Sequence, residues 1–459
     1  MQRISERVGR PIASVRTTNI VTNQKEEPTV TNPSHSKAAR VFALTLLAGL
    51  TLAGAVIGSQ AQSALGHRPP GVSRVSRQRP WRGTFRPAHA AQSPSSAPTW
   101  SPVFPAVSDP DLFAFRAEHS AVYDPGSNTM IVFGGVDQNY AMQSNVLTET
   151  NANGNGGAVA GAWSELPTDV FPFPPARSFH SAVYDQSNNR MIVFGGCADS
   201  ECLIPLNDTW VLTNANGTGG TATWSQLNPI GTPPNPRANH NAVYDAANKR
   251  MMVFSGDNGS VPFSDVWVLS NANGLGGTPA WTQLSPTGGT PDAIDGSTAV
   301  YDPAANIMIV FSGGNFLNSS WILSNANGVG GTPAWTNLLA NGAAGSPKGR
   351  IGAAAIYDST SNRMTIYGGN SGGGISNPDL DFVALGDVWV LANANGAGGS
   401  PVWTQLHPKV AGDGGIPPVG REFFTAVRDP GTDSMIIFGG DSIEGIYLST
   451  WVLSHANGL

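Results

Sequence analysis

Short apolar segments recur at regular intervals between residues 99 and 459, and polar turn residues separate them. In the clearest example, HSAVYD ends at residue 124 and MIVFGG begins six residues later. A third segment of the WVL type and a fourth of the WTQL type complete the unit. The segments are rich in β-branched and aromatic residues, which is typical of antiparallel strands joined by turns. The pattern therefore predicts a unit of four short strands.

The four-strand unit occurs six times along the chain. Its first strand is found at residues 119–124, 180–185, 240–245, 297–302, 353–358 and 424–429. A four-stranded sheet that is apolar on both faces cannot bury itself, but a closed ring of such sheets can. The repeats therefore predict an all-β fold, a six-bladed β-propeller of four-stranded antiparallel blades over residues 99–459.

The sixth copy lacks its fourth strand at the C-terminal end. The chain stops at SHANGL, where the other copies continue through an NANGxGG loop into a tryptophan-containing strand. The segment TWSPVFP at 99–105 has the pattern of that missing strand. Because an open blade would expose a sheet edge, we expect this N-terminal strand to complete the sixth blade and close the ring.

The repeat resembles the Kelch repeat. The resemblance rests on Arg177 three residues before His180, on a strand that ends in Gly-Gly, and on Asn207, Asp208 and Trp210. It extends over residues 99–459 and is weaker in the last three copies. It implies a propeller whose blades each have four strands.

Kelch domains resemble the central domain of galactose oxidase, but the copper chemistry of that enzyme is not expected here. The chain has only two cysteines. His119, His180 and His240 occupy equivalent positions in three separate copies. The resemblance therefore applies to the scaffold, and we expect no cofactor.

Charge is distributed unevenly along the chain. Only 12% of residues are charged, against roughly 25% in an average globular protein. Residues 1–98 carry a net charge of +10, and the remaining residues carry −16. An acidic body repels phosphate backbones, so we expect no nucleic-acid partner for the propeller.

The sequence before the repeats predicts that the protein is exported. Residues 1–37 form a polar basic tail, and residues 38–58 are strongly apolar, either a signal peptide or a transmembrane segment. Residues 59–98 are rich in Pro and Arg and predict a disordered linker. We therefore expect an exported protein, anchored by its N-terminal helix or secreted after cleavage, with no other membrane contact.

Loop lengths distinguish the two faces of the predicted ring. The connections between first and second strands, and the NANGxGG loops between third and fourth strands, are nearly constant in length; we call their side the constant face. The connections between second and third strands and between blades form the other side, the variable face. From the last Gly of strand two to the Trp of strand three, copies 2 to 6 have steps of 14, 11, 7, 20 and 11 residues. Variable loops on a rigid scaffold favour recognition by this second face.

The longest variable-face insertions, residues 370–386 and 407–420, indicate a candidate site. They and the adjoining loops bring together six acidic residues: Asp379, Asp381, Asp413, Glu422, Asp441 and Glu444. These carboxylates could bind a cation or a polyol, or they could form a solvated acidic surface. Both interpretations stay open.

An arginine precedes the first strand in five copies. These residues are Arg116, Arg177, Arg237, Arg350 and Arg421. A ring of guanidinium groups near the channel mouth could bind a carboxylate or a sugar acid, with Arg421 beside the acidic loops. Alternatively, the repeat-related arginines pair with neighbouring blades.

The two cysteines, Cys197 and Cys202, lie in the second-to-third strand loop of copy 2. Their short spacing and the export expectation predict a local disulfide, with two free thiols as the alternative. No metal site is expected, because the NANGxGG loops lack the paired carboxylates that calcium prefers. Asn-Gly and Gly-Gly are ordinary turn residues.

These observations favour a non-enzymatic recognition module that binds a protein or a glycan through its variable face, as a monomeric propeller. No residue is predicted to be catalytic. The alternative is a carbohydrate-active enzyme of the cell envelope, such as a sugar epimerase on a Kelch scaffold. Such an enzyme needs a general acid and base, and Glu422 beside Arg421 is the one candidate.

Overall fold

The computed structural model describes residues 97–459, apart from 105, 108–114, 156–160, 169–170, 292–294, 373–382 and 413–414. The chain divides into two compact units, residues 1–71 and 72–459, and all described residues belong to the second. The predicted tail, the apolar segment and nearly all of the linker lie outside the described residues. Within the described part, no helix is long and apolar enough to span a membrane.

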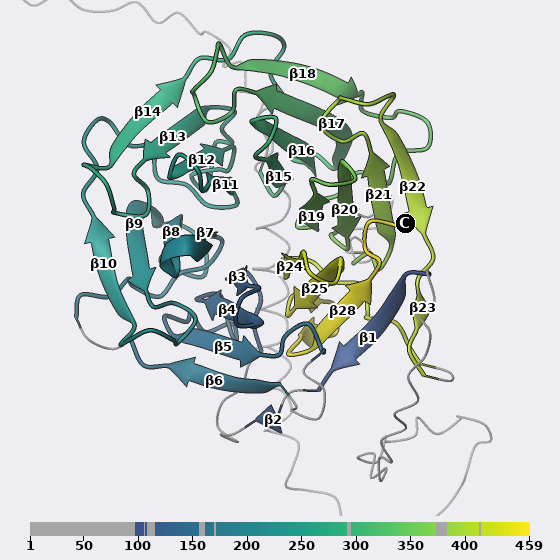
Figure 1. Ribbon diagram of the computed structural model, residues 1–459, viewed down its shortest axis with the longest axis horizontal. Coiled ribbons are helices and arrows are strands. Elements are labelled where there is room, and N and C mark those ends of the chain that lie inside the picture. The colour runs from purple at the N-terminus through teal and green to yellow at the C-terminus, as the bar shows by residue number, and fades with distance from the viewer. Residues whose placement is uncertain are drawn as a thin grey trace, which may run out of the picture. The chain divides into compact units, whose positions relative to one another are not determined.

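Six antiparallel sheets surround a central axis, with the first strand of each blade innermost (Figure 1). Blade one contains β3 (Ser120–Asp124), β4 (Thr129–Phe133), β5 (Val146–Thr150) and β6 (Ala162–Leu166). Blade two contains β7 (Ser181–Asp185), β8 (Arg190–Cys197), β9 (Pro205–Thr213) and β10 (Thr223–Leu227). Blade three contains β11 (Asn241–Asp245), β12 (Arg250–Phe254), β13 (Val266–Ser270) and β14 (Ala280–Leu284).

The other three blades repeat this plan. Blade four contains β15 (Thr298–Asp302), β16 (Ile307–Gly313), β17 (Leu317–Ser324) and β18 (Ala334–Leu339). Blade five contains β19 (Ala354–Asp358), β20 (Arg363–Tyr367), β21 (Val388–Ala392) and β22 (Val402–Leu406). Blade six contains β24 (Thr425–Asp429), β25 (Ser434–Phe438), β28 (Thr450–Ser454) and β1 (Thr99–Val103). The predicted fold and blade number are thereby confirmed.

The N-terminal strand closes the ring. β1 pairs antiparallel with β28 over its whole length, from Thr99 opposite Ser454 to Val103 opposite Thr450. β23 (Lys409–Val410) then pairs parallel with the outer edge of β1, and β2 (Ala106–Val107) covers β6 in the same way. The outermost strand is thus partly covered at these two blades, which limits an exposed edge.

The hydrophobic core lies between neighbouring blades. At each of the six seams, the tryptophan of one fourth strand lies against an aromatic ring on the second strand of the preceding blade. The pairs are Trp163–Phe438, Trp224–Phe133, Trp281–Phe194, Trp335–Phe254, Trp403–Phe311 and Trp100–Tyr367, with ring centroids 4.6 to 5.1 Å apart. Because each blade buries its faces against its neighbours, the ring must close for the core to be complete.

Candidate functional site

Side-chain hydrogen bonds on the constant face hold neighbouring blades together. In every NANG-type loop, the last asparagine donates its side-chain amide to the aspartate that ends the first strand of the preceding blade. The pairs are Asn153–Asp429, Asn216–Asp124, Asn273–Asp185, Asn327–Asp245, Asn395–Asp302 and Asn457–Asp358, at 2.6 to 2.9 Å. Sequence reasoning explained these loops as turns and missed this role. The signal was the joint recurrence of the aspartate and the asparagine in all six copies.

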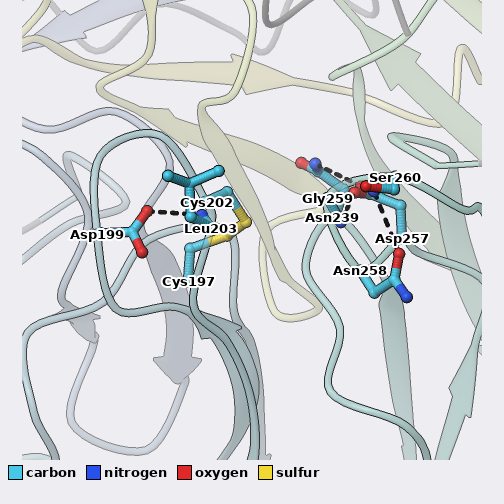
Figure 2. Close-up of a disulfide and its surroundings, with 9 residues drawn as sticks. All are labelled: Cys197, Asp199, Cys202, Leu203, Asn239, Asp257, Asn258, Gly259 and Ser260. Atoms are coloured by element: carbon cyan, nitrogen blue, oxygen red, sulfur yellow. Dashed lines mark hydrogen bonds between the residues drawn. A yellow bond between two sulfur atoms is a disulfide. The ribbon is translucent and has the colours of Figure 1, made fainter. Parts of the chain in front are cut away.

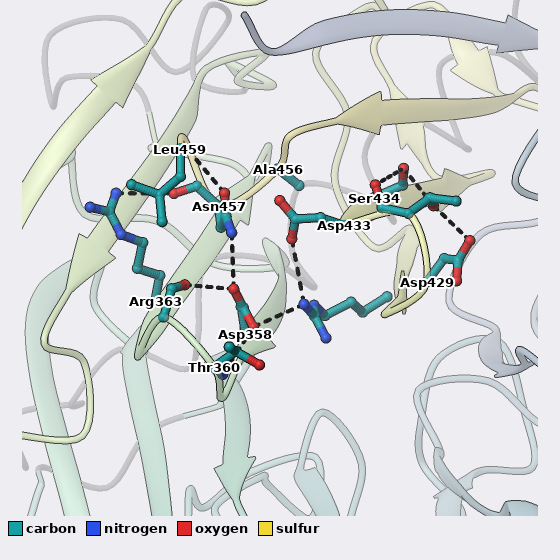
Figure 3. Close-up of polar contacts among 12 residues, drawn as sticks. Asp358, Thr360, Arg363, Asp429, Asp433, Ser434, Ala456, Asn457 and Leu459 are labelled. Atoms are coloured by element: carbon teal, nitrogen blue, oxygen red, sulfur yellow. Dashed lines mark hydrogen bonds and ion pairs between the residues drawn. The ribbon is translucent and has the colours of Figure 1, made fainter. Parts of the chain in front are cut away.

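The seam between blades five and six shows the contact in detail (Figure 3). Asn457 donates to Asp358, and Arg363 donates to the backbone carbonyl of Asn457 at 3.0 Å. Arg428, which stands where each of the other five copies has Tyr, forms an ion pair with Asp358 at 2.9 Å. In each of these pairs the two partners come from different blades, so the contacts of this face hold the seam between the blades together.

The variable face narrows at the axis to a closed ring of backbone hydrogen bonds. One residue from each blade donates its N–H to the carbonyl of its neighbour, at 2.9 to 3.1 Å. In order, the ring runs through Glu118, Phe423, Gly352, Gly296, Asn239 and Phe179, each donating to the next. All six have left-handed backbone, with φ between 50° and 64°. The mouth is therefore a rigid frame whose side chains differ from blade to blade.

A cavity of about 150 Å³ lies at this ring. Its lining comprises the six ring residues and the six that follow them, His119, His180, His240, Ser297, Ala353 and Phe424. The His180 Nε2 lies 2.8 Å from the hydroxyl of Ser120 in the preceding blade, and His240 contacts Ser181 in the same way. Burial, with the nearby arginines contributing, lowers the pKa of His119 and of His240 to about 3, so these side chains are neutral at pH 7.

The arginines that precede the first strands make structural contacts inside the blades. Arg177 is fully buried and forms two hydrogen bonds of 2.8 Å with the carboxylate of Asp208 in its own blade. Burial alone would raise the pKa of Asp208, but the hydrogen bonds and charge of Arg177 outweigh it and hold that pKa below its ordinary value. Arg237 and Arg350 make the same pair with Asp265 and Asp387.

For Arg177, Arg237 and Arg350, pairing with a neighbouring blade is corrected, since their guanidinium groups form ion pairs with aspartates of their own blades. Arg116 donates to Asn145, and the buried Arg421 donates to the carbonyl of Gly439. The carbonyl of Arg421 accepts the N–H of Gly369 from the preceding blade at 2.8 Å. A Cβ on that glycine would lie 2.8 Å from the Ile351 carbonyl oxygen, which explains why the second strand ends in glycine.

The predicted acidic site is only partly described. Glu422 and Asp441 lie opposite each other through a backbone bridge, and Asn370 donates to the Glu422 carboxylate at 3.3 Å. Glu444 is exposed on the turn between β26 (Asp441–Ser442) and β27 (Gly445–Ile446). The other three predicted members, Asp379, Asp381 and Asp413, lie outside the described residues. No group of three or more metal-ligating side chains occurs in the described part of the chain.

Cys197 and Cys202 form a disulfide at the base of the second-to-third strand loop of blade two (Figure 2). Both sulfur-bearing residues are buried, and they pack with Ala238 and the partly buried Phe179 of the axial ring. The Asp199 carboxylate accepts the backbone N–H of Leu203 at 2.7 Å, which fixes the loop tip. Leu203 itself is 80% exposed.

Exposed apolar side chains are concentrated on the variable face. Among the described residues, thirteen of the sixteen exposed large hydrophobic side chains lie in its connections. They are Phe104, Tyr140, Phe171, Phe173, Leu203, Ile204, Ile230, Val261, Val383, Ile416, Val419, Ile443 and Leu448. The constant-face loops and the chain end contribute Val329 and Leu459. A contiguous exposed apolar patch is typical of a protein-binding face, whereas single exposed apolar side chains are common on any protein surface.

A family model agrees with the repeat assignment over part of the chain. Residues 99–274 match the model of the KLHDC2/KLHL20/DRC7 Kelch-repeats domain. A solved structure of YjhT is similar at 15% identity and a TM-score of 0.49, covering 74% of this chain and 94% of that one.

Three curated proteins show distant similarity over part of their length. The dynein alpha chain of the flagellar outer arm from Chlamydomonas reinhardtii is 25% identical over 325 residues, 60% of this chain and 7% of the dynein. The Rho GTPase-activating protein gacHH from Dictyostelium discoideum is 26% identical over 37% of this chain and 10% of its own length. The serine/threonine-protein phosphatase BSL2 from Arabidopsis thaliana is 26% identical over 56% of this chain and 25% of its own length. The chain thus spans at most a quarter of these relatives.

Proposed function

We propose that this chain, a six-bladed Kelch-repeat β-propeller, is an exported recognition module that binds a partner protein through its variable face. The observation that carries the proposal is the asymmetry between the two faces. Exposed apolar side chains lie mainly in the variable-face connections. On the constant face, the asparagine and aspartate side chains form hydrogen bonds between neighbouring blades. Interfaces that bind proteins are centred on desolvated apolar side chains.

The scaffold beneath the variable face supports this role. The closed ring of backbone hydrogen bonds and the paired arginines hold the loop bases in fixed positions. A preorganised surface loses less conformational entropy when a partner binds. The variable loops therefore stand on a frame suited to rigid recognition.

A protein partner is favoured over a glycan. Glycan binding commonly uses exposed aromatic faces. The described tryptophans are buried or partly buried in the blades, and four of the thirteen exposed large hydrophobic side chains of the variable face are aromatic: Phe104, Tyr140, Phe171 and Phe173. The other nine are aliphatic, among them Leu203, Ile204 and Ile443, with Ile443 86% exposed. Aliphatic side chains gain more from an apolar protein surface than from sugar hydroxyls.

Site-specific photo-crosslinking in the native cell tests the proposal. A benzophenone amino acid would replace Leu203 or Ile443 on the variable face, and Val329 or Leu459 as exposed control positions elsewhere. We expect one shared protein adduct from the first two positions and none from the other two. Equal adducts from all four positions, or adducts only from Val329 and Leu459, would contradict the proposal.

A further inference from the structure

The outer edge of the fourth strand is covered by another segment of the chain in four blades. In blade three, Ile230 donates its N–H to the carbonyl of Pro279 at 2.9 Å and accepts the N–H of Trp281 at 3.0 Å. Thr287 forms the same two hydrogen bonds with blade four, and β2 and β23 cover blades one and six. The connection into blade two includes residues 169–170, which lie outside the described residues. In all four cases the cover runs parallel to the strand and comes from the connection that enters the blade.

β22, the fourth strand of blade five, has no such cover among the described residues. It is the outermost strand of its sheet (Figure 1), and within the described part of the chain no bridge or backbone hydrogen bond reaches its outer edge. Trp403 and Pro401 are equivalent to Trp281 and Pro279, so the N–H of Trp403 and the carbonyl of Pro401 point outward. Val402, which lies between them, is 54% exposed. The start of β22 therefore presents a donor, an acceptor and an apolar side chain.

The connection into blade five differs in sequence from the connections that provide a cover. In each of those four, a proline stands five residues after the tryptophan of the preceding fourth strand, and the covering residue follows it. The pairs are Pro105-Ala106, Pro229-Ile230, Pro286-Thr287 and Pro408-Lys409. Proline holds itself and the residue before it in extended backbone, which suits a segment that approaches a strand edge. In the connection into blade five, the equivalent residues are Ala340 and Asn341.

Hydrogen bonds hold this connection on blade four instead. The side-chain oxygen of Asn341 accepts the N–H of Asn318 on β17 at 3.0 Å, and the side-chain oxygen of Asn318 accepts the N–H of Gly342 at 2.7 Å. The Asn318 amide also donates to the carbonyl of Pro347 at 2.8 Å. The connection is thus fixed by specific contacts away from β22, and these contacts keep the edge open.

The open edge also lacks the usual protection against pairing. Proteins commonly block an exposed strand edge with a charged residue, a proline or a bulge, because its free N–H and carbonyl groups are a template for another strand. The sequence of β22, VWTQL, contains no charge and no proline, and its register with β21 is regular. The edge is therefore suited to pairing, and the covers of the other blades show which kind of segment such an edge accepts.

We propose that the outer edge of β22 binds an extended segment of a partner protein in which a proline precedes the pairing residue. The segment adds to blade five as a short parallel strand. Its pairing residue donates its N–H to the Pro401 carbonyl and accepts the N–H of Trp403, as Ile230 does in blade three. Main-chain hydrogen bonds of this kind supply affinity when a peptide extends a sheet. The site lies on the outer rim of blade five, so it does not rest on the function proposed for the variable face.

Amide exchange and peptide titration, both by NMR of the full-length protein labelled with ¹⁵N-tryptophan, test the proposal. In the free protein, the uncovered N–H of Trp403 should exchange at least about tenfold faster than that of Trp281. The probe is the peptide acetyl-LNPIGT-amide, which copies residues 227–232, the cover of blade three. We expect it to shift the Trp403 amide signal and slow its exchange, and to leave Trp281 and Trp335 unchanged. Methylation of the isoleucine nitrogen of the peptide removes the donor and should weaken binding about tenfold.

A pair of matched variants tests the edge itself. Val402→Lys places a charge on β22 and should weaken peptide binding severalfold, whereas Val329→Lys, at an exposed position in a constant-face loop, should leave it unchanged.

Four results would overturn the proposal. If Trp403 is as protected as Trp281 in the free protein, another part of this chain already covers the edge. If that protection rises with protein concentration, a second copy covers it. Equal binding of the parent and N-methylated peptides, or an unshifted Trp403 signal at millimolar peptide, would show that no strand is added. The photo-crosslinking test of the variable face does not bear on these readouts, so the two proposals can fail separately.

Discussion

Replacing Trp100 by alanine should destabilise the propeller as strongly as a change in the middle of the core, although the residue lies near the start of the described chain. Trp100 is 2% exposed and lies edge to face against Tyr367 of blade five, with centroids 5.1 Å apart. A tryptophan buries about 200 Å², worth about 5 kcal/mol at about 25 cal/mol per Å². Measured losses for Trp→Ala in cores are about 3–5 kcal/mol, a large share of a total stability of about 5–15 kcal/mol.

Urea unfolding followed by intrinsic fluorescence measures this loss. The matched control is Phe104→Ala, which removes a side chain that is 73% exposed just beyond the same strand and should change stability by less than about 0.5 kcal/mol. If Trp100→Ala and Phe104→Ala gave the same midpoint, β1 would not close the ring in solution.

Three further changes test other parts of the structure. Burial raises the pKa of Glu149 to about 8 against a hydrogen bond from Thr450, so the folded state holds a proton that the unfolded state has already lost above about pH 4.5. Stability should therefore fall by about 1.4 kcal/mol per pH unit between about pH 5 and 8, and Glu149→Gln should flatten this slope in pH-dependent urea melts; parallel profiles would contradict it. Asn273→Ala removes the 2.6 Å donor to buried Asp185 across a seam and should cost about 2 kcal/mol in the same melts, whereas no loss would show that the seam contact is dispensable. Alkylation of the purified protein without reductant should add no label to its two cysteines, and two labels would refute the disulfide.

The architecture could be predicted from the sequence because it is repeated six times. The strand segments, their constant spacing and the missing strand of the last copy together specify the blade number and the closure by residues 99–103. The tryptophans could be assigned to the core for the same reason, since they recur in register. Repetition supplied an internal comparison that a single copy lacks.

Contacts across the seams could not be predicted in the same way. Asn273 and Asp185 are 88 residues apart, and each is also a common turn residue, so neither indicated a partner in another blade. The direction of an arginine side chain is equally hidden, and nothing in the sequence indicates that the Arg421 side chain is buried. Both features depend on side-chain direction, which strand periodicity alone does not give at loop positions.

The six positions of the axial ring could not be predicted as a group, because the regular pattern of the repeat lies in the arginine and histidine on either side of them. These positions are occupied by Glu, Phe, Asn, Gly, Gly and Phe in successive copies. This variation within an otherwise regular segment was the available signal. The backbone ring that brings those six positions to one point on the axis appears only in the folded structure.

The affinity of the partner identified by crosslinking, measured by calorimetry on two matched double variants of the full-length protein, tests the role of the variable face most directly. Leu203→Asp with Ile443→Asp places two charges on the variable face, and Val329→Asp with Leu459→Asp places two at exposed positions outside it. If the variable face is the binding surface, the first pair should weaken binding by roughly a hundredfold and the second by less than about twofold, with similar melting temperatures. Equal affinities for the two variants, or a selective loss from Val329→Asp with Leu459→Asp, would contradict it.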